Sequence, residues 1–228
     1  MSKMSKTFVI SLLAMLCSAA IVAAGINDGL VVYYDFDEAN GTVAYDSAGN
    51  RDATLKNGTT RGAGKRGNAV AFDGANDYVD AGTDSLGVSS AITVSAWVNR
   101  AGSGSGTTTG IVERGNYMYP FWLDMVGQSV KNGVRTSGTN YIQNPNYIAD
   151  NAWHHLAFTY NGSYQALYVD GNEVDSDSNS GTLDDRSGKL LTIGRTAGGS
   201  GYFNGLIDEV KIYDQALSPS EIAELASQ

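Results

Sequence analysis

The sequence has 228 residues, with 24 acidic against 15 basic side chains and a formal net charge of −9 at pH 7. This excess of acid argues against nucleic acid and anionic membranes as partners, because both need clustered lysine and arginine. It suits neutral glycans and divalent cations, although solubility alone is a simpler explanation of the charge.

Residues 1–24 have the pattern of a secretory signal peptide. A basic start precedes an apolar run over 7–22, and small residues follow it. We therefore expect an exported protein, whether periplasmic, secreted or at the cell surface, in which residues 25–228 form a single domain and no membrane contact remains after cleavage. An uncleaved signal anchor is the alternative. The only cysteine, Cys17, lies in the signal, so the mature chain must gain its stability from a core or a bound metal.

Glycine is abundant at 28 residues and proline scarce at 3, and short β-branched or aromatic runs alternate with turn residues. This pattern predicts an antiparallel all-β domain. The predicted strands cover 30–36, 69–72, 78–81, 91–99, 110–114, 120–126, 153–160, 165–169, 189–193 and 206–213. Asn-Gly at 161–162 and Asp-Gly at 170–171 predict tight hairpins, hence a three-strand meander over 153–174. Polar segments at 100–109 and 175–188 predict long loops.

The predicted strand over 206–213 places one acid among its core residues. At period two, Asp208 shares a face with Val210 and Ile212, whereas Lys211 lies on the other face. A buried carboxylate must be paired, hydrogen-bonded or bound to a cation. No lysine or arginine shares the face of Asp208, so calcium is a candidate partner, with a hydrogen-bonded acid as the alternative.

The last element is predicted to be a short helix. Ser218 as N-cap, Pro219 at the first helical position and Glu221 as reciprocal partner form a capping box. The helix should extend to about residue 226.

Several segments combine aromatic, glycine and acidic residues in a fixed order. They are Tyr-Asp-Phe-Asp-Glu at 34–38, Asp-Ser-Ala-Gly-Asn at 46–50, Gly-Asn-Ala-Val-Ala-Phe-Asp-Gly at 67–74, and the segments 92–98, 153–162, 168–171 and 205–210. Together they resemble the laminin G-like group of the concanavalin A-like lectin and glucanase superfamily. The resemblance implies a jelly roll, which is an antiparallel two-sheet β-sandwich, here with one short C-terminal helix. Relatives are commonly glycan-binding or adhesion modules, and some related folds are enzymes.

The resemblance also implies a structural calcium ion held by acids from both ends of the chain. The expected oxygen donors are Asp35, Asp37, Asp46 and Asp208, with Asp73 as a further candidate. For Asp46 and Asp73 the alternative is a turn-capping role through backbone amides.

A sugar site needs flat aromatic rings for stacking and polar side chains for hydroxyl groups. Trp97 lies on the polar side of its predicted strand, and several aromatic residues fall between residues 115 and 150, a stretch rich in glycine and asparagine. Packing within the sandwich is the alternative for these rings. The expected ligand-binding residues are Trp97, Arg114, Tyr119, Trp122 and Tyr141.

The leading hypothesis is an exported, non-catalytic, calcium-containing domain whose partner is a polysaccharide or surface glycan. The first alternative is a polysaccharide-degrading enzyme. A lyase is favoured over a hydrolase, because no predicted strand carries the alternating carboxylates of the superfamily's glucanases. The second alternative is an adhesive surface protein that recognises another protein.

Overall fold

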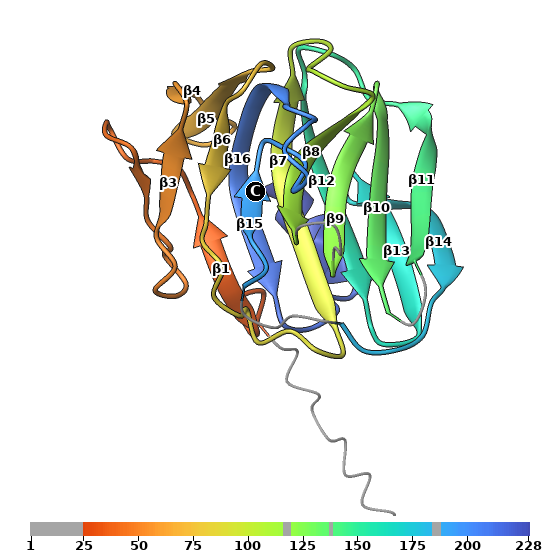
Figure 1. Ribbon diagram of the computed structural model, residues 1–228. Helices are drawn as coiled ribbons and strands as arrows, with labels where there is room; N and C mark the ends of the chain where they lie inside the picture. The colour runs from red at the N-terminus through yellow and green to blue at the C-terminus, as the bar shows by residue number, and fades with distance from the viewer. Residues whose placement is uncertain (1–24, 116–119, 137–138, 184–187) are drawn as a thin grey trace, which may run out of the picture.

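The computed structural model describes residues 25–115, 120–136, 139–183 and 188–228, so the predicted signal peptide lies outside the described residues. Two antiparallel sheets of eight strands each pack face to face. We call the sheet that contains β7 and β16 sheet A and the sheet that contains β9 and β10 sheet B, and sheet B lies in front in Figure 1. This arrangement confirms the predicted two-sheet sandwich. Within the described ranges no helix has the length and apolarity needed to span a membrane.

Sheet A follows the order β14-β13-β12-β7-β16-β5-β4, and β1 also pairs with β16. Its strands are β1 (Leu30–Tyr34), β4 (Thr60–Ala63), β5 (Asn68–Asp73), β7 (Ile92–Arg100), β12 (Trp153–Tyr160), β13 (Tyr164–Val169), β14 (Asn172–Ser178) and β16 (Asn204–Tyr213). The predicted meander is present as β12, β13 and β14. The loop expected over 175–188 starts later than predicted, because β14 continues to Ser178.

Sheet B follows the order β11-β10-β9-β8-β15-β6-β3-β2. Its strands are β2 (Val43–Ala44), β3 (Ala53–Lys56), β6 (Tyr78–Asp80), β8 (Thr108–Arg114), β9 (Phe121–Val126), β10 (Ser129–Arg135), β11 (Thr139–Tyr147) and β15 (Leu191–Ile193). We call the face that each sheet turns away from the other sheet its outer face.

One apolar core fills the space between the sheets, and its residues extend from Val32 to Ile212. A smaller apolar cluster lies on the outer face of sheet A, beneath helix α1 (Pro219–Ser227). The predicted capping box is present, since the Ser218 side chain accepts from the Glu221 amide and the Glu221 side chain accepts from the Ser218 amide. Ile222 and Leu225 of the helix are buried against sheet A.

Strand β7 alternates as its sequence predicts. Its residues in the core are Ile92, Val94, Ala96 and Val98. Trp97 lies outside this core, on the outer face of sheet A. Alternate residues of a strand point to opposite faces, so the polar side of β7 is its outer side.

Strand β16 contains a β-bulge at Glu209. Residues that precede the bulge therefore point to the opposite side of the sheet from the side that the sequence predicts. Ile207 belongs to the core, whereas Asp208 lies opposite Trp97 on the outer face. Glu209 has a φ of 51°, and the register of β16 against β7 shifts there. Val210 then returns to the core. The prediction that Asp208 shares a face with Val210 is therefore wrong, because one extra residue shifts the alternation of a strand.

Candidate functional site

The outer face of sheet B carries a row of residues that pair directly across four strands. Glu113 of β8 pairs with Trp122 of β9, Trp122 with Gly133 of β10, and Gly133 with Tyr141 of β11. Directly paired residues share one face of a sheet. Leu123, the residue after Trp122, lies in the core, so this row faces outward.

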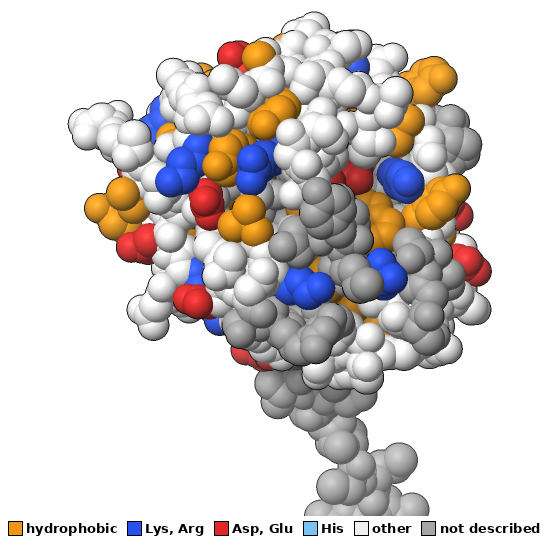
Figure 2. Space-filling view, in the orientation of Figure 1, with side chains coloured by type: hydrophobic (Ala, Val, Ile, Leu, Met, Phe, Trp, Pro, Cys, Tyr) orange, Lys and Arg blue, Asp and Glu red, His pale blue; other side chains and the backbone are white. Residues whose placement is uncertain are grey.

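A second row on the same face adds charge beside the aromatic rings. Asp124 of β9 pairs with Lys131 of β10. A cavity of about 510 Å³ lies over both rows and is lined by Glu113, Trp122, Asp124 and Lys131. Loop residues, among them Thr107 and Thr196, complete its lining. Figure 2 views the molecule from this face, where apolar and basic side chains are exposed over β9 to β11.

The ring of Trp122 packs flat against the backbone of β10. A Cβ atom added at Gly133 would overlap the six-membered part of the indole, so only glycine leaves room for it there. The Trp122 side chain is held in the floor of the cavity and the residue is 8% exposed. This packing fixes the ring parallel to the sheet, which is the orientation that a stacked ligand requires.

Two carboxyl groups, Glu113 and Asp124, form a buried pair beside this ring. They are hydrogen-bonded to each other, and Glu113 Oε2 also accepts from the Ala197 amide at 2.6 Å. Burial raises the pKa of both groups, and for Asp124 the charge of Glu113 raises it further. The positive charge of Lys131 lowers the pKa of both groups and so partly opposes these effects. Asp124 Oδ1 has no hydrogen-bond partner among the described residues, although Asp124 is only 5% exposed.

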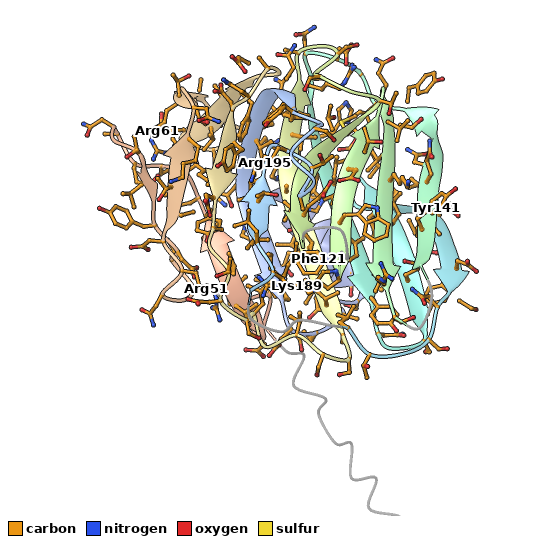
Figure 3. The ribbon with its side chains drawn as sticks, in the orientation of Figure 1. Arg51, Arg61, Phe121, Tyr141, Lys189 and Arg195 are labelled. Carbon is orange, nitrogen blue, oxygen red and sulfur yellow. The ribbon has the colours of Figure 1, made fainter. Side chains whose placement is uncertain are left out.

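Two cations contact aromatic rings around the cavity. Lys131 Nζ lies 4.1 Å from the ring centre of Tyr141, and the Arg195 guanidinium carbon lies 3.5 Å from the ring centre of Tyr78. Figure 3 shows Tyr141 on the β11 edge and Arg195 near the middle of the same face. The cavity itself combines one aromatic ring, Trp122, with the carboxyl groups of Glu113 and Asp124 and the ammonium group of Lys131, and Tyr141 lies beside it on the same face.

The structure brings two of the five predicted ligand residues together, Trp122 and Tyr141. Trp97 lies on the outer face of sheet A, where its ring contacts His155 and Lys65. Arg114 points into the core, is 0% exposed and donates from Nη2 to the Asp84 carbonyl oxygen at 2.9 Å.

The fifth predicted ligand residue, Tyr119, lies outside the described residues. Arg114 is separated from the cavity because it is the neighbour of Glu113 on the same strand, and neighbours point to opposite faces.

The charged residues of the cavity, which are Glu113, Asp124 and Lys131, were not predicted as ligand-binding residues. The sequence contained a signal for Asp124, because it follows Trp122 by two residues within a predicted strand and must share its face. The position of Lys131 could not be inferred in this way, because the sequence of β10 does not predict a strand.

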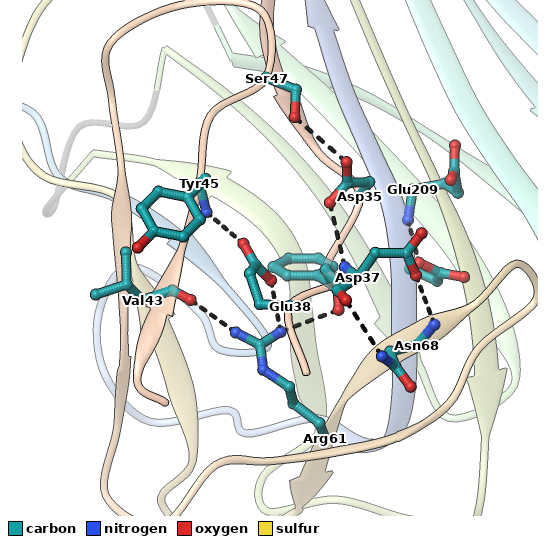
Figure 4. A network of polar contacts seen from close by, with 11 residues as sticks. Asp35, Asp37, Glu38, Val43, Tyr45, Ser47, Arg61, Asn68 and Glu209 are labelled. Atoms are coloured by element: carbon teal, nitrogen blue, oxygen red, sulfur yellow. Dashed lines mark hydrogen bonds and ion pairs between the residues drawn. The ribbon is translucent and has the colours of Figure 1, made fainter. Parts of the chain in front are cut away.

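The predicted metal ligands Asp35 and Asp37 belong to a polar network around the 64–68 segment, shown in Figure 4. Asp37 Oδ1 accepts from the Asn68 amide at 2.7 Å, and Asp35 accepts from the Asp37 amide and the Ser47 hydroxyl at 3.1 and 3.3 Å. In the same network Arg61 forms an ion pair with Glu38 at 2.8 Å.

Asp208 is buried next to the same segment. It accepts from the Arg66 amide at 3.0 Å and the Glu209 amide at 2.8 Å. Burial raises the pKa of Asp208 to about 7, which these amides partly oppose. The alternative of a hydrogen-bonded acid is therefore present in the structure.

Asp46 and Asp73 both receive amides, as their turn-capping alternative requires. Asp46 accepts from the amides of Tyr33, Ala48 and Arg51 at 2.9 to 3.1 Å. Asp73 Oδ1 accepts hydrogen bonds from the backbone amides of Ala75 and Asn76, in the turn that follows β5.

Asp73 is also far from the other acids, because it ends β5 while Asn68 begins it, five residue steps or about 16 Å away. In the part of the chain that the structure describes, no three His, Cys, Asp or Glu side chains are grouped so as to hold a metal ion. These oxygens serve backbone amides, and the calcium site stays a prediction.

A comparison with protein-family models identifies the class of protein. A laminin G family model, described as concanavalin A-like lectin/glucanases superfamily, matches residues 73–223. The chain therefore belongs to this family, as its motifs predicted. No curated protein sequence matches the chain.

Several solved structures share the fold. Domain 4 of AbnA, a GH43 extracellular arabinanase from Geobacillus stearothermophilus in complex with arabinotriose, is 25% identical with a TM-score of 0.72, over 86% of this chain and 98% of that domain. The binding domain of Paraclostridial Mosquitocidal Protein 1 is 18% identical with a TM-score of 0.68, over 88% of this chain.

The binding domain of botulinum neurotoxin DC in complex with SialylT is 12% identical with a TM-score of 0.66, over 89% of this chain. The chain spans 52% of each of these two toxin structures, and their likeness concerns the fold alone.

Proposed function

We propose that the outer face of sheet B binds carbohydrate, with Trp122 and Tyr141 as stacking rings and the polar side chains of the cavity, Lys131 among them, as partners of ligand hydroxyls. The observation that carries the proposal is the Trp122 ring held flat on Gly133 in the floor of a cavity of about 510 Å³. Sugar recognition combines such rings with a few fixed polar groups. Lys131, Thr196 and Ser200 line the same cavity and supply polar groups for ligand hydroxyls.

The chemistry of the cavity favours a neutral glycan. The hydrogen bond between Glu113 and Asp124 requires a proton on one of them, so the pair carries one negative charge, which Lys131 in the same lining balances. A ligand carboxylate would lose hydration in this site without gaining a net opposite charge. The arabinotriose complex of the 25% identical arabinanase domain supports a neutral oligosaccharide as ligand class.

The test is a binding titration of the mature domain against neutral and acidic polysaccharides. We expect saturable retention on at least one neutral polysaccharide, such as arabinan, and weaker retention on an acidic one, such as polygalacturonate. Affinity electrophoresis measures both in one experiment, and calorimetry with soluble oligosaccharides gives the dissociation constant. Retention on none of the neutral polymers would contradict the proposal.

The carboxyl pair does not favour a hydrolase. Glycosidases hold their two carboxyl groups about 5 to 9.5 Å apart so that the sugar or a water fits between them. Glu113 and Asp124 are instead hydrogen-bonded to each other. A lyase would need a histidine or arginine beside a tyrosine, but His155 lies on the outer face of sheet A and Arg114 in the core, so neither lies in the cavity.

Export and a structural calcium complete the proposal. Export is supported by the pattern of residues 1–24, and N-terminal sequencing of the protein recovered outside the cytoplasm would test cleavage before Gly25. For calcium we propose Asp37 and Asp208 as the carboxylate ligands, with backbone carbonyl oxygens supplying the rest of the coordination, because both acids accept from amides of the 64–68 segment.

Chelation tests the calcium proposal. We expect purified wild-type protein to contain calcium and its melting temperature to fall when a chelator removes the ion, because the metal binds only the folded state. The Asp208→Asn variant keeps an amide acceptor but lacks the charge, so its melting temperature should respond less. An unchanged melting temperature in a protein without metal would show that backbone amides alone satisfy these acids.

A further inference from the structure

A third row of paired residues continues the outer face of sheet B beyond the cavity. Thr108 of β8 pairs with Val126 of β9, Val126 with Ser129 of β10, and Ser129 with Tyr147 of β11. Val126 follows Trp122 and Asp124 at period two, so the three rows lie on one face.

Tyr147 is the most exposed large apolar side chain described, at 73%, and Tyr141 on the same edge strand is 56% exposed. The Tyr141 ring also contacts Lys131, and the two exposed rings mark the two ends of the binding face along this edge strand.

A second cavity of about 380 Å³ lies at Tyr147. Its lining includes Val126, Gln128 and the ion pair between Arg100, which is buried, and Asp150, which is partly exposed. It therefore offers the same combination as the first cavity, an aromatic ring beside fixed polar groups. Strand β9 passes both cavities, with Trp122 and Asp124 lining the first and Val126 lining the second.

The spacing between the two cavities follows from the strand geometry. On β10, Gly133 lies opposite Tyr141 and Ser129 lies opposite Tyr147, four residue steps apart. At about 3.3 Å per residue the two tyrosines mark positions about 13 Å apart along the strand direction. A single sugar ring cannot contact rings at both positions, whereas an extended chain of several sugars can.

We infer that the outer face of sheet B is an extended site with two aromatic subsites, one at Trp122 and Tyr141 and one at Tyr147, that holds a linear oligosaccharide lying along β9 to β11. This inference rests on the proposed carbohydrate binding and adds its ligand class, the interior of a linear chain in preference to a single terminal sugar. Lys131, which lines the first cavity, lies on the side of that subsite nearer to Tyr147 and supplies a polar contact for the sugars there.

A chain-length series tests the inference. We expect arabino-, xylo- or cello-oligosaccharides that bind to gain at least tenfold in affinity from the disaccharide to the hexasaccharide, as measured by calorimetry. Tyr147→Ala should lower hexasaccharide affinity about tenfold and leave disaccharide affinity unchanged, because only the longer ligand reaches the second subsite. Tyr147→Phe, which keeps the ring, should restore most of the hexasaccharide affinity.

The control is Tyr164→Ala, which removes a ring 41% exposed on β13 of the other sheet and should change neither affinity. Binding that is equally tight at every length, or a Tyr147→Ala effect equal for short and long ligands, would overturn the extended site and leave carbohydrate binding intact. Failure of wild-type protein to bind any length in all three series would count against the proposed function itself and the inference with it.

Discussion

Replacement of Trp122 by alanine is expected to weaken glycan binding about 30-fold, or about 2 kcal/mol, the loss typical of a central aromatic anchor. The ring lies in the floor of the larger cavity and is held flat against β10 at Gly133. Its removal takes away both the stacking surface and the wall beside Asp124. Calorimetry with the tightest-binding oligosaccharide measures the change.

The Gly133→Ala variant tests the position of the Trp122 ring without removing it. The added methyl group would overlap the indole and tilt it away from the sheet, so affinity should fall although the aromatic ring is still present. The folded state of each variant is checked by circular dichroism and thermal melting. If a folded Trp122→Ala variant bound the oligosaccharide with wild-type affinity, the proposed sugar site on the outer face of sheet B would be wrong.

Replacement of Gly194 by alanine is expected to cost about 2 to 5 kcal/mol of unfolding free energy. Gly194 follows β15 with a φ of 83°, a region that costs an L-residue about 1 to 2 kcal/mol. A Cβ atom there would also overlap the ring of Phe72, which packs edge-on against Phe203 in the core, and overpacking adds about 1 to 3 kcal/mol. For a domain of this size we expect the melting temperature to fall by about 10 °C.

The Gly82→Ala variant separates the cost of the positive φ from the cost of the overlap with Phe72. Gly82 has a similar φ of 75°, but an added Cβ atom would meet nothing within 4 Å. This variant should therefore lose only the backbone contribution, about 1 kcal/mol or about 3 °C. If the two variants melted alike, the contact between Gly194 and Phe72 would contribute nothing to stability.

The fold was predictable because several of its central strands, β7 among them, obey simple alternation. Strand β7 places every second residue in the core, and the capping box around Ser218 fixes the helix start. Strands β10 and β11 were not predicted, since β10 carries Asn132 and Gly133 in its middle and β11 contains Pro145. Their pairing in the sheet overrides weak local preference.

The site was predictable only in part, because it depends on register between strands. Trp122 and Tyr141 were found as aromatic residues, but their common face follows from pairing through Gly133. Trp97 has the same local appearance as Trp122, and only the assignment of strands to sheets separates them. The bulge at Glu209 likewise depends on tertiary pairing, so the alternation of the sequence assigned Asp208 to the wrong face.

The antiparallel pairing of β1 with β16 decides how the domain would respond to a pulling force. Leu30 pairs with Tyr213 and Tyr34 with Val210, so the chain enters β1 and leaves β16 at the same end of the ladder. A load applied to the two ends would first detach α1 and then peel the ladder open from Leu30, one pair at a time. Such a geometry resists tension weakly, because the hydrogen bonds bear the force in sequence and never together.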